Sequence, residues 1–175
     1  MTNEEKQPQT IEEAVDMLHA NIRLNSVDLK RLWEIVTAQF PLGIHSIHGP
    51  RHWKRVKKNG LMLAKETGAD ETIVELFSMF HDSRRENENI DDGHGARGAE
   101  LAKSMKGIYF DLPDHSFEIL LEACRDHTNG KSTSNITIAT CWDADRLDLP
   151  RVGIIPEPGR MGTAPGRRLA RIKWK

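Results

Sequence analysis

The chain has 175 residues, of which 38% are hydrophobic and 29% are charged, and its formal net charge is −1. This length suits one domain with a substantial core, and the near-zero charge excludes a general electrostatic attraction to nucleic acid or to an anionic membrane. No apolar run is long enough to cross a bilayer, and no basic and then apolar leader opens the sequence, so we expect a cytoplasmic protein without a membrane partner.

Apolar residues recur at helical spacing along most of the chain. Thr10 is placed to cap a first helix and Ser26 a second, while Pro50 can open a third helix that ends near Gly68. Asp70 opens the most apolar helix of the chain. The expected helices cover, approximately, residues 11–25, 27–40, 50–68, 70–81, 94–105, 114–127 and 135–149.

The alternating pattern that would mark a sheet is missing except for the short stretch ITIAT, so we expect an all-α fold built as a single helical bundle. Its parts are a polar lead and helix over residues 1–25, a helical domain over residues 26–150 and an irregular basic segment over residues 151–175. The last segment is rich in Gly and Pro and holds no acid after Glu157. Both cysteines fall in apolar helical patterns, which indicates reduced core residues.

Two imidazoles and two carboxylates stand out because each lies in an apolar helical context: His52, His81, Asp82 and Asp145. Burying such a group without a partner is costly, so each of them needs compensation. In a helical bundle, inward side chains on facing helices commonly build a metal site. Nitrogen and oxygen donors without a thiolate suit manganese, iron, cobalt, nickel, magnesium or zinc.

The same four side chains could instead form a buried ion-pair network. In that interpretation Arg55 and Arg146 compensate the aspartates, and no metal is needed. The neighbouring Asp143 and Asp148 would orient ligands or Arg146 in one case, and would cap or pair on the surface in the other. Spacing alone leaves both interpretations open.

The motifs HGPRHW, HD and DADRLD, in this order on helical segments, resemble the HD-domain superfamily of metal-dependent phosphohydrolases over residues 48–149. The resemblance implies an HD-domain-like bundle in which His52, the doublet His81–Asp82 and Asp145 bind a divalent ion. Asp145 matches the family's aspartate better than Asp143 does, because it follows an alanine and precedes a basic residue. The stretch HDSRRENENIDDGHGARGAEL also resembles one subgroup of small bacterial HD proteins.

Some members of the superfamily, including the HD-GYP phosphodiesterases and the iron oxygenases, add histidines that hold a second ion bridged by the doublet's aspartate. His94 and His127 are the corresponding candidates here, so the resemblance implies one or two divalent ions. His94 begins a helix beside three glycines, where a ligand can approach the backbone, and His127 ends a helix on the face of Cys124. The plainer alternatives are a helix-start residue in a loop for His94 and a favourable cation at a helix C-terminus for His127.

The expected chemistry places several further residues near the metal. A divalent ion lowers the pKa of bound water toward neutrality, and phosphate-ester hydrolysis also needs positive charge beside the phosphoryl oxygens. Arg85 is the first candidate for that charge, Arg55 the second and Lys131 the third, although each could equally be an exposed cation at a helix end. Glu86 could position the water or act as a base, and His48 could protonate the leaving group.

The sequence therefore predicts a metal-dependent phosphohydrolase that acts on a small phosphate ester or nucleotide. Two alternatives remain open: a di-iron oxygenase on the same ligands, and a non-catalytic ligand-binding or regulatory HD module. The basic C-terminal segment has little aromatic interleaving beyond Trp174, which argues against nucleic acid as a partner and favours a solvated or partner-contacting tail.

Overall fold

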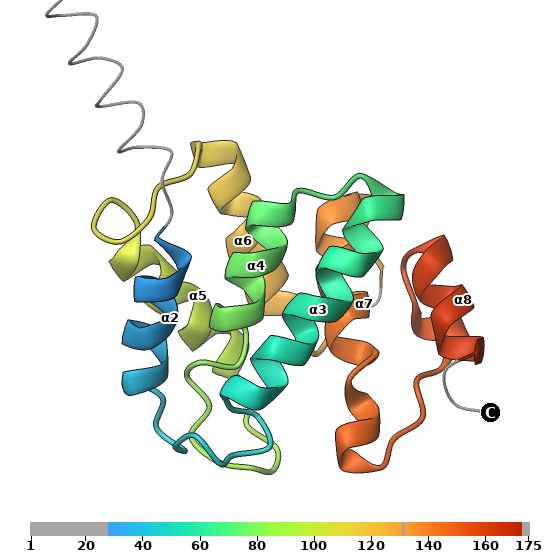
Figure 1. Cartoon of the computed structure of the whole chain (residues 1–175), viewed down its shortest axis with the longest axis horizontal. Helices are drawn as coiled ribbons and strands as arrows, with labels where there is room; N and C mark the ends of the chain where they lie inside the picture. Colours follow the sequence, from blue (N-terminus) through green and yellow to red (C-terminus); the bar gives the residue numbers. More distant parts are fainter. Residues whose placement is uncertain (1–27, 131, 173–175) are drawn as a thin grey trace, which may run out of the picture.

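The computed structural model describes residues 28–130 and 132–172, which are helical and contain no β-strand within those ranges (Figure 1). The all-α prediction is confirmed. The first predicted helix and the predicted caps Thr10 and Ser26 lie outside the described residues. The elements are α2 (Leu29–Ala38), α3 (Pro50–Thr67), α4 (Glu71–Phe80), α5 (His94–Met105), α6 (Asp114–Asp126), α7 (Ile136–Arg146), the 3-10 helices η1 (Leu149–Val152) and η2 (Pro158–Arg160), and α8 (Ala164–Ile172).

Local sequence signals explain where most of these helices begin and end. Asp28, Asp70 and Asn135 accept hydrogen bonds from backbone N–H groups in the first turns of α2, α4 and α7. Helix α3 begins instead at Pro50, whose fixed φ suits a first helical turn, and it stops at Gly68, which has a φ of 73°. The strand-like stretch ITIAT belongs to α7, which the Asn135 cap starts.

Aromatic and aliphatic side chains from the helices form one core. Helix α3 packs against α4 and α7, and α5 packs against α6, while α2 and α8 lie at opposite ends of the bundle (Figure 1). Trp53, Phe77, Phe80, Leu120 and Leu147 are buried in this core, and burying one such side chain contributes on the order of 1.5–3 kcal/mol. Both cysteines are free thiols in the same core. None of the described helices combines the length and apolar composition needed to cross a membrane.

The C-terminal segment differs from its prediction, because only its first part is irregular and Ala164–Ile172 form helix α8. A buried carboxylate organises this region. Asp143 of α7 accepts hydrogen bonds from the backbone N of Gly162, and from both the backbone N and the hydroxyl of Thr163, at 2.7–2.8 Å. The Thr163 hydroxyl accepts in turn from the backbone N of Gly166, so it caps α8. A long-range contact therefore overrides the local signals of Gly and Pro.

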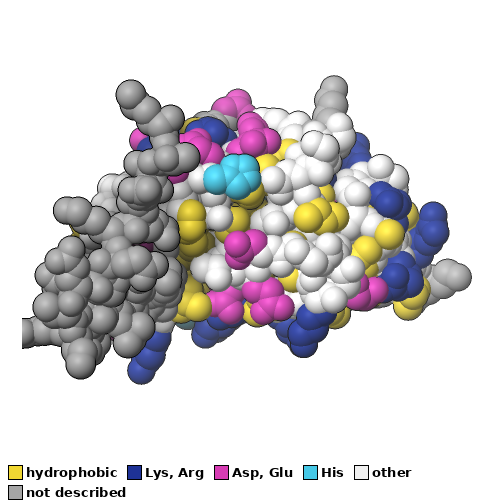
Figure 2. Space-filling view, turned by 90° about the horizontal axis from the view of Figure 1, so that it is seen from above, with side chains coloured by type: hydrophobic (Ala, Val, Ile, Leu, Met, Phe, Trp, Pro, Cys, Tyr) yellow, Lys and Arg dark blue, Asp and Glu magenta, His cyan; other side chains and the backbone are white. Residues whose placement is uncertain are grey.

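Basic side chains gather at the end of the molecule that carries α8 (Figure 2). Arg167, Arg168 and Arg171 are exposed on this helix. Arg168 pairs with both carboxylate oxygens of Glu66 on α3 at 2.7 Å. This contact fastens α8 to the body of the bundle, while Arg167 donates to the backbone oxygens of Met161 and Gly162 at 2.9 and 3.2 Å.

Candidate metal centre

Three helices bring together the four residues of the first predicted ligand set: His52, His81, Asp82 and Asp145. His52 lies in the first turn of α3, and Asp145 lies in the last turn of α7. His81 and Asp82 directly follow the last turn of α4. The Nε2 atoms of His52 and His81 are 3.0 Å apart, and Asp145 Oδ1 lies 3.2 Å from the former and 3.8 Å from the latter. Asp82 Oδ2 faces the same two nitrogens at 3.6 and 3.8 Å.

The other oxygen of Asp82 faces a second pair of histidines. His94, at the start of α5, and His127, at the end of α6, place their Nε2 atoms 2.9 Å apart. Asp82 Oδ1 lies 3.2 Å from His94 Nε2 and 3.5 Å from His127 Nε2. The described residues thus contain two buried groups that could hold a metal ion, and the Asp82 carboxylate belongs to both of them.

The hydrogen bonds of the four imidazoles determine which nitrogen of each ring faces the centre. Every Nδ1 lies next to an oxygen that can only accept, so every Nδ1 carries a hydrogen. In a neutral ring Nε2 is then the lone-pair atom, as in protein sites where a ligating histidine donates its other N–H to an oxygen. The Nδ1 partners are Asp148 Oδ2 for His52 (2.7 Å), Phe77 O for His81 (3.1 Å), Asp91 O for His94 (2.6 Å) and Cys124 O for His127 (2.8 Å).

Two neutral imidazoles arranged in this way point lone pairs at each other and repel unless a proton or a metal cation lies between them. Two nitrogens that bind one ion at about 2.0–2.1 Å stand roughly 3 Å apart when they meet at about a right angle. The His52–His81 and His94–His127 separations match this spacing. Asp82 Oδ1 is buried and has no hydrogen-bond partner in the described part of the chain, although buried carboxylate oxygens normally have one. The donor set therefore fits divalent cations.

Burial and neighbouring charges set the ionisation of the cluster. Burial lowers the pKa of His81 to about 3, which keeps this imidazole neutral. Burial raises the pKa values of Asp82 and Asp145, but the surrounding histidines more than offset it and hold both values below the usual range. Burial likewise lowers the pKa values of His52 and His127, yet the nearby carboxylates of Asp145 and Asp82, respectively, raise them overall. A histidine binds a metal only when its ligating nitrogen carries no proton, so the raised pKa values of these two histidines make metal binding compete with protons.

The ion-pair network considered as an alternative needs arginines against the central aspartates. Arg55 instead donates to Asp148 at 2.7 Å, and Arg146 donates to the backbone oxygens of Gly130 and Arg160 at 2.6 and 2.9 Å. Arg85 is the cation closest to Asp82, with Nη1 3.6 Å from Oδ1. The arginines expected to compensate the aspartates are therefore engaged elsewhere.

Two glycines let α5 approach its neighbours closely enough to place His94. A β-carbon at Gly95 would overlap the backbone oxygen of Cys124, and one at Gly98 would overlap that of Phe80. The glycines beside His94 were expected to let a ligand approach the backbone. Gly95 and Gly98 also serve helix packing, because they bring α5 against α6 and α4, while Gly93 precedes the helix with a φ of 86°.

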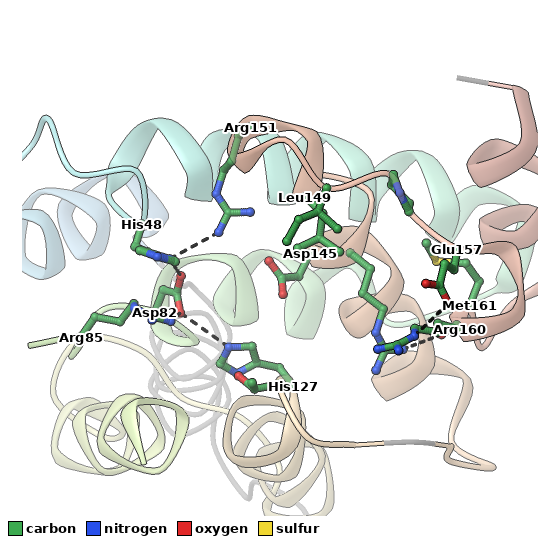
Figure 3. Close-up of a pocket in the computed structure, with 14 residues that line it drawn as sticks. His48, Asp82, Arg85, His127, Asp145, Leu149, Arg151, Glu157, Arg160 and Met161 are labelled. Atoms are coloured by element: carbon green, nitrogen blue, oxygen red, sulfur yellow. Dashed lines mark hydrogen bonds and ion pairs between the residues drawn. The ribbon is translucent and has the colours of Figure 1, made fainter. Parts of the chain in front are cut away.

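A cavity of about 330 Å³ opens next to the cluster (Figure 3). His48, Asp82 and Arg85 lie at one end, and Glu157 and Arg160 lie at the other. This volume falls at the lower end of the range for small-molecule sites in proteins. The cavity thus connects the candidate metal centre to the irregular part of the C-terminal segment.

The structure brings two of the four predicted catalytic residues to this cavity. His48 Nδ1 lies 2.9 Å from Asp82 Oδ2, and Arg85 donates to the backbone oxygen of Asn89 at 2.6 Å while facing Asp82. Arg55 and Glu86 are outside the cavity lining; the side chain of Arg55 is 46% exposed and held by Asp148, and that of Glu86 is 66% exposed and lies 3.5 Å from Arg97.

The sequence analysis does not predict three other arginines that line the cavity. Arg151 was treated only as part of the Gly- and Pro-rich segment, yet it lines the cavity with its Nη2 3.3 Å from His48 Nδ1. Arg146 was considered only as a partner of aspartates, and Arg160 only as part of a basic tail. The only feature of the sequence that points to Arg151 and Arg160 is the excess of arginine after the motif DADRLD. Lys131, the third candidate cation, lies outside the described residues.

Comparison of the chain with protein-family models, with curated proteins and with solved structures finds no match. Its function is therefore inferred from the site.

Proposed function

We propose that this chain is a metal-dependent phosphohydrolase of the HD superfamily that acts on a small phosphate ester or nucleotide. The observation that carries this proposal is the pair of His/Asp groups sharing Asp82, together with the arginine-lined cavity beside them. A carboxylate and histidine cluster suits divalent ions, and arginines suit the phosphate oxygens.

Two sets of residues would hold the metal. His52, His81, Asp82 and Asp145 would bind one ion, and Asp82 with His94 and His127 would bind a second. When bound, divalent ions lower the pKa of a coordinated water and neutralise charge on phosphoryl oxygens.

Among the arginines and lysines of the described residues, Arg85 lies nearest to the shared carboxylate. Its Nη2 is fixed by the backbone oxygen of Asn89, and its Nη1 lies 3.3 Å from His94 Nε2 and 3.6 Å from Asp82 Oδ1. Because the guanidinium is held in place before substrate arrives, it can bind phosphoryl oxygens without much loss of side-chain freedom. We assign Arg85 to orientation of the phosphate.

His48 is the proton-transfer candidate. A carboxylate accepts hydrogen bonds, so the 2.9 Å contact with Asp82 Oδ2 places the hydrogen of His48 on Nδ1. With that hydrogen held on Nδ1, His48 can protonate the leaving group from Nε2 only when Nε2 also carries a proton, and Asp82 keeps the ring oriented. Arg151, beside the same imidazole, contributes positive charge to this end of the cavity.

Metal analysis followed by activity assays tests the proposal. Protein purified without added metal should contain one or two equivalents of a divalent ion, and it should release phosphate from a panel of phosphate esters supplied with manganese, iron, cobalt, nickel, magnesium or zinc. The double variant His81→Ala/Asp82→Ala should lose both metal and activity. The matched control Asp114→Ala/His115→Ala removes an exposed Asp-His doublet on α6 and should keep both.

Other outcomes point to the alternative functions. Iron-dependent oxygen consumption on a substrate without phosphate would identify an oxygenase. Retention of biological function by the metal-free double variant would identify a binding or regulatory module and would refute the enzymatic proposal.

A further inference from the structure

The irregular segment between α7 and α8 forms the wall of the cavity that lies away from the metal centre. Glu157 and Met161 from this segment face the cavity at the end away from His48 and Arg85, Leu149 lies between the two ends, and Arg151 lies beside His48 (Figure 3). A substrate whose phosphate lies at the metal end must therefore place the rest of its structure against this wall.

Hydrogen bonds hold this segment in position at both ends. Arg151 Nε donates to the backbone oxygen of Ile47 at 3.1 Å, which ties the start of the segment to the loop before α3. Asp143 accepts from the backbone N of Gly162 at 2.8 Å, which ties its end to α7. The segment contains only the short helices η1 and η2 but is anchored to the bundle, so its side chains form a defined surface.

Arg146 provides a positive charge at this far end. Its two terminal nitrogens donate to the backbone oxygens of Gly130 and Arg160, and its guanidinium lies 5.7 Å from the ring centre of Trp142. Its side chain is 15% exposed. The nearest carboxylate recorded among the described residues is Asp143 at 3.9 Å, and both oxygens of that group accept stronger hydrogen bonds from the segment. The charge of Arg146 is thus fixed in place but only weakly compensated.

Arg160 adds a second positive charge beside Arg146, but solvent and a neighbouring carboxylate screen it more strongly. It is 76% exposed and pairs with Glu157 at 3.1 Å. The cavity lining also includes an apolar set of side chains. The apolar lining residues are Leu149, Ile154, Pro156 and Met161.

We propose that Arg146 forms a second anion subsite, so that the substrate is a phosphate ester carrying another anionic group, a phosphate or a carboxylate, at its far end. This inference rests on the proposed phosphohydrolase function for the phosphate that is cleaved. An aliphatic or ring-containing spacer between the two anions would contact the apolar wall. Arg146 determines specificity and takes no part in the chemical step.

Matched substrates test this subsite through hydrolysis. The ω-carboxyalkyl phosphates with two to six carbons should be compared with alkyl phosphates of equal length, on the metal-loaded protein. We expect kcat/KM to favour the best carboxylated ester by about tenfold or more, as for a charge-assisted hydrogen bond. In Arg146→Gln this ratio should fall to about one, mainly through a higher KM for the carboxylated ester. The control Arg171→Gln removes an exposed charge from α8 and should keep the ratio.

A binding assay separates failure of the subsite from failure of the hydrolase proposal. Alkane-α,ω-bisphosphonates and alkylphosphonates of equal length cannot be hydrolysed, and their affinities for the metal-loaded protein can be measured by calorimetry. A bisphosphonate preference of about tenfold that Arg146→Gln removes supports the subsite even if no ester is cleaved. Equal affinities for both series in the wild-type protein, or an unchanged preference in Arg146→Gln, would overturn it.

Arg146→Gln also removes two hydrogen bonds to the backbone, so its fold must be checked independently. Arg146→Lys keeps the charge but not the planar fork, and it should retain part of the bisphosphonate preference. If Arg146→Gln and Arg146→Lys lose the same fraction of affinity for monophosphonates and bisphosphonates alike, Arg146 only supports the cavity wall and the subsite does not exist.

Discussion

Replacing Asp148 tests the metal centre without altering a ligand. Its Oδ2 accepts from His52 Nδ1 at 2.7 Å, and its Oδ1 accepts from Arg55 at 2.7 Å. Asparagine keeps the size of the side chain but removes the charge that orients the imidazole and makes its other nitrogen more basic. Loss of such a partner typically lowers metal affinity by about 10- to 100-fold, which corresponds to about 1.4–2.7 kcal/mol.

The affinity of Asp148→Asn can be measured by competition with a chromophoric chelator at fixed pH. The loss should affect one of the two bound equivalents, because the second group of ligands contains neither His52 nor its neighbours on α3. Arg55→Gln is the matched control, since it removes the other partner of the same carboxylate; it should change affinity by less than about threefold. Unchanged metal binding in Asp148→Asn, or an equal loss in both variants, would refute the idea that this carboxylate acts through His52.

Three further predictions follow from the packing around the cluster. Gly95→Ala should force α5 away from Cys124 O and separate His94 from His127, which should reduce the metal content from two equivalents to one. The same variant should lose about 1–3 kcal/mol of unfolding free energy, measured with urea. Retention of both metal equivalents would contradict the packing argument. Asp143→Asn turns one acceptor into a donor facing Thr163 N, so it should destabilise the fold by about 1–3 kcal/mol, and a smaller change would mean that α8 docks without this carboxylate. Removing the metal with a chelator should lower the melting temperature by about 5–10 °C relative to protein supplied with metal at about 100 times Kd, because a ligand that binds only the folded state stabilises it by mass action. An unchanged melting temperature would argue against a metal held in the core.

Local sequence signals were sufficient to predict most helix boundaries, because a helix begins and ends according to residues that are close together in the chain. Asp70 and Pro50 start helices where expected, and Gly68 ends one, since a cap or a left-handed turn acts within a few residues. Local signals gave the wrong prediction for α8, because its Gly and Pro residues predict an irregular segment. There, a buried carboxylate from α7 organises the start of the helix, and no pattern within the segment reports that contact.

The histidines and aspartates of the centre could be selected from the sequence because each is a polar group in an apolar helical pattern, and because their order resembles a known family. Their roles as metal ligands remain a proposal, but the structure places five of the six predicted ligands in two buried groups and Asp145, half-buried, beside the first of them. The cations were harder to assign. Proximity to the motifs along the chain favours Arg55 and Glu86, yet neither side chain lines the cavity.

The sequence by itself determined the helical class, most helix boundaries and the histidines and aspartates of the central cluster, because these depend on periodicity, capping and the cost of burying charge. Only the tertiary structure decided which imidazole nitrogen faces the centre, that Asp82 belongs to two groups of ligands, and that arginines from the C-terminal segment line the cavity. Those features arise from contacts between residues far apart in the chain, such as His52 with Asp148 and Arg151 with His48. Their geometry follows from the packing of helices against one another, which the spacing of residues along a single helix does not predict.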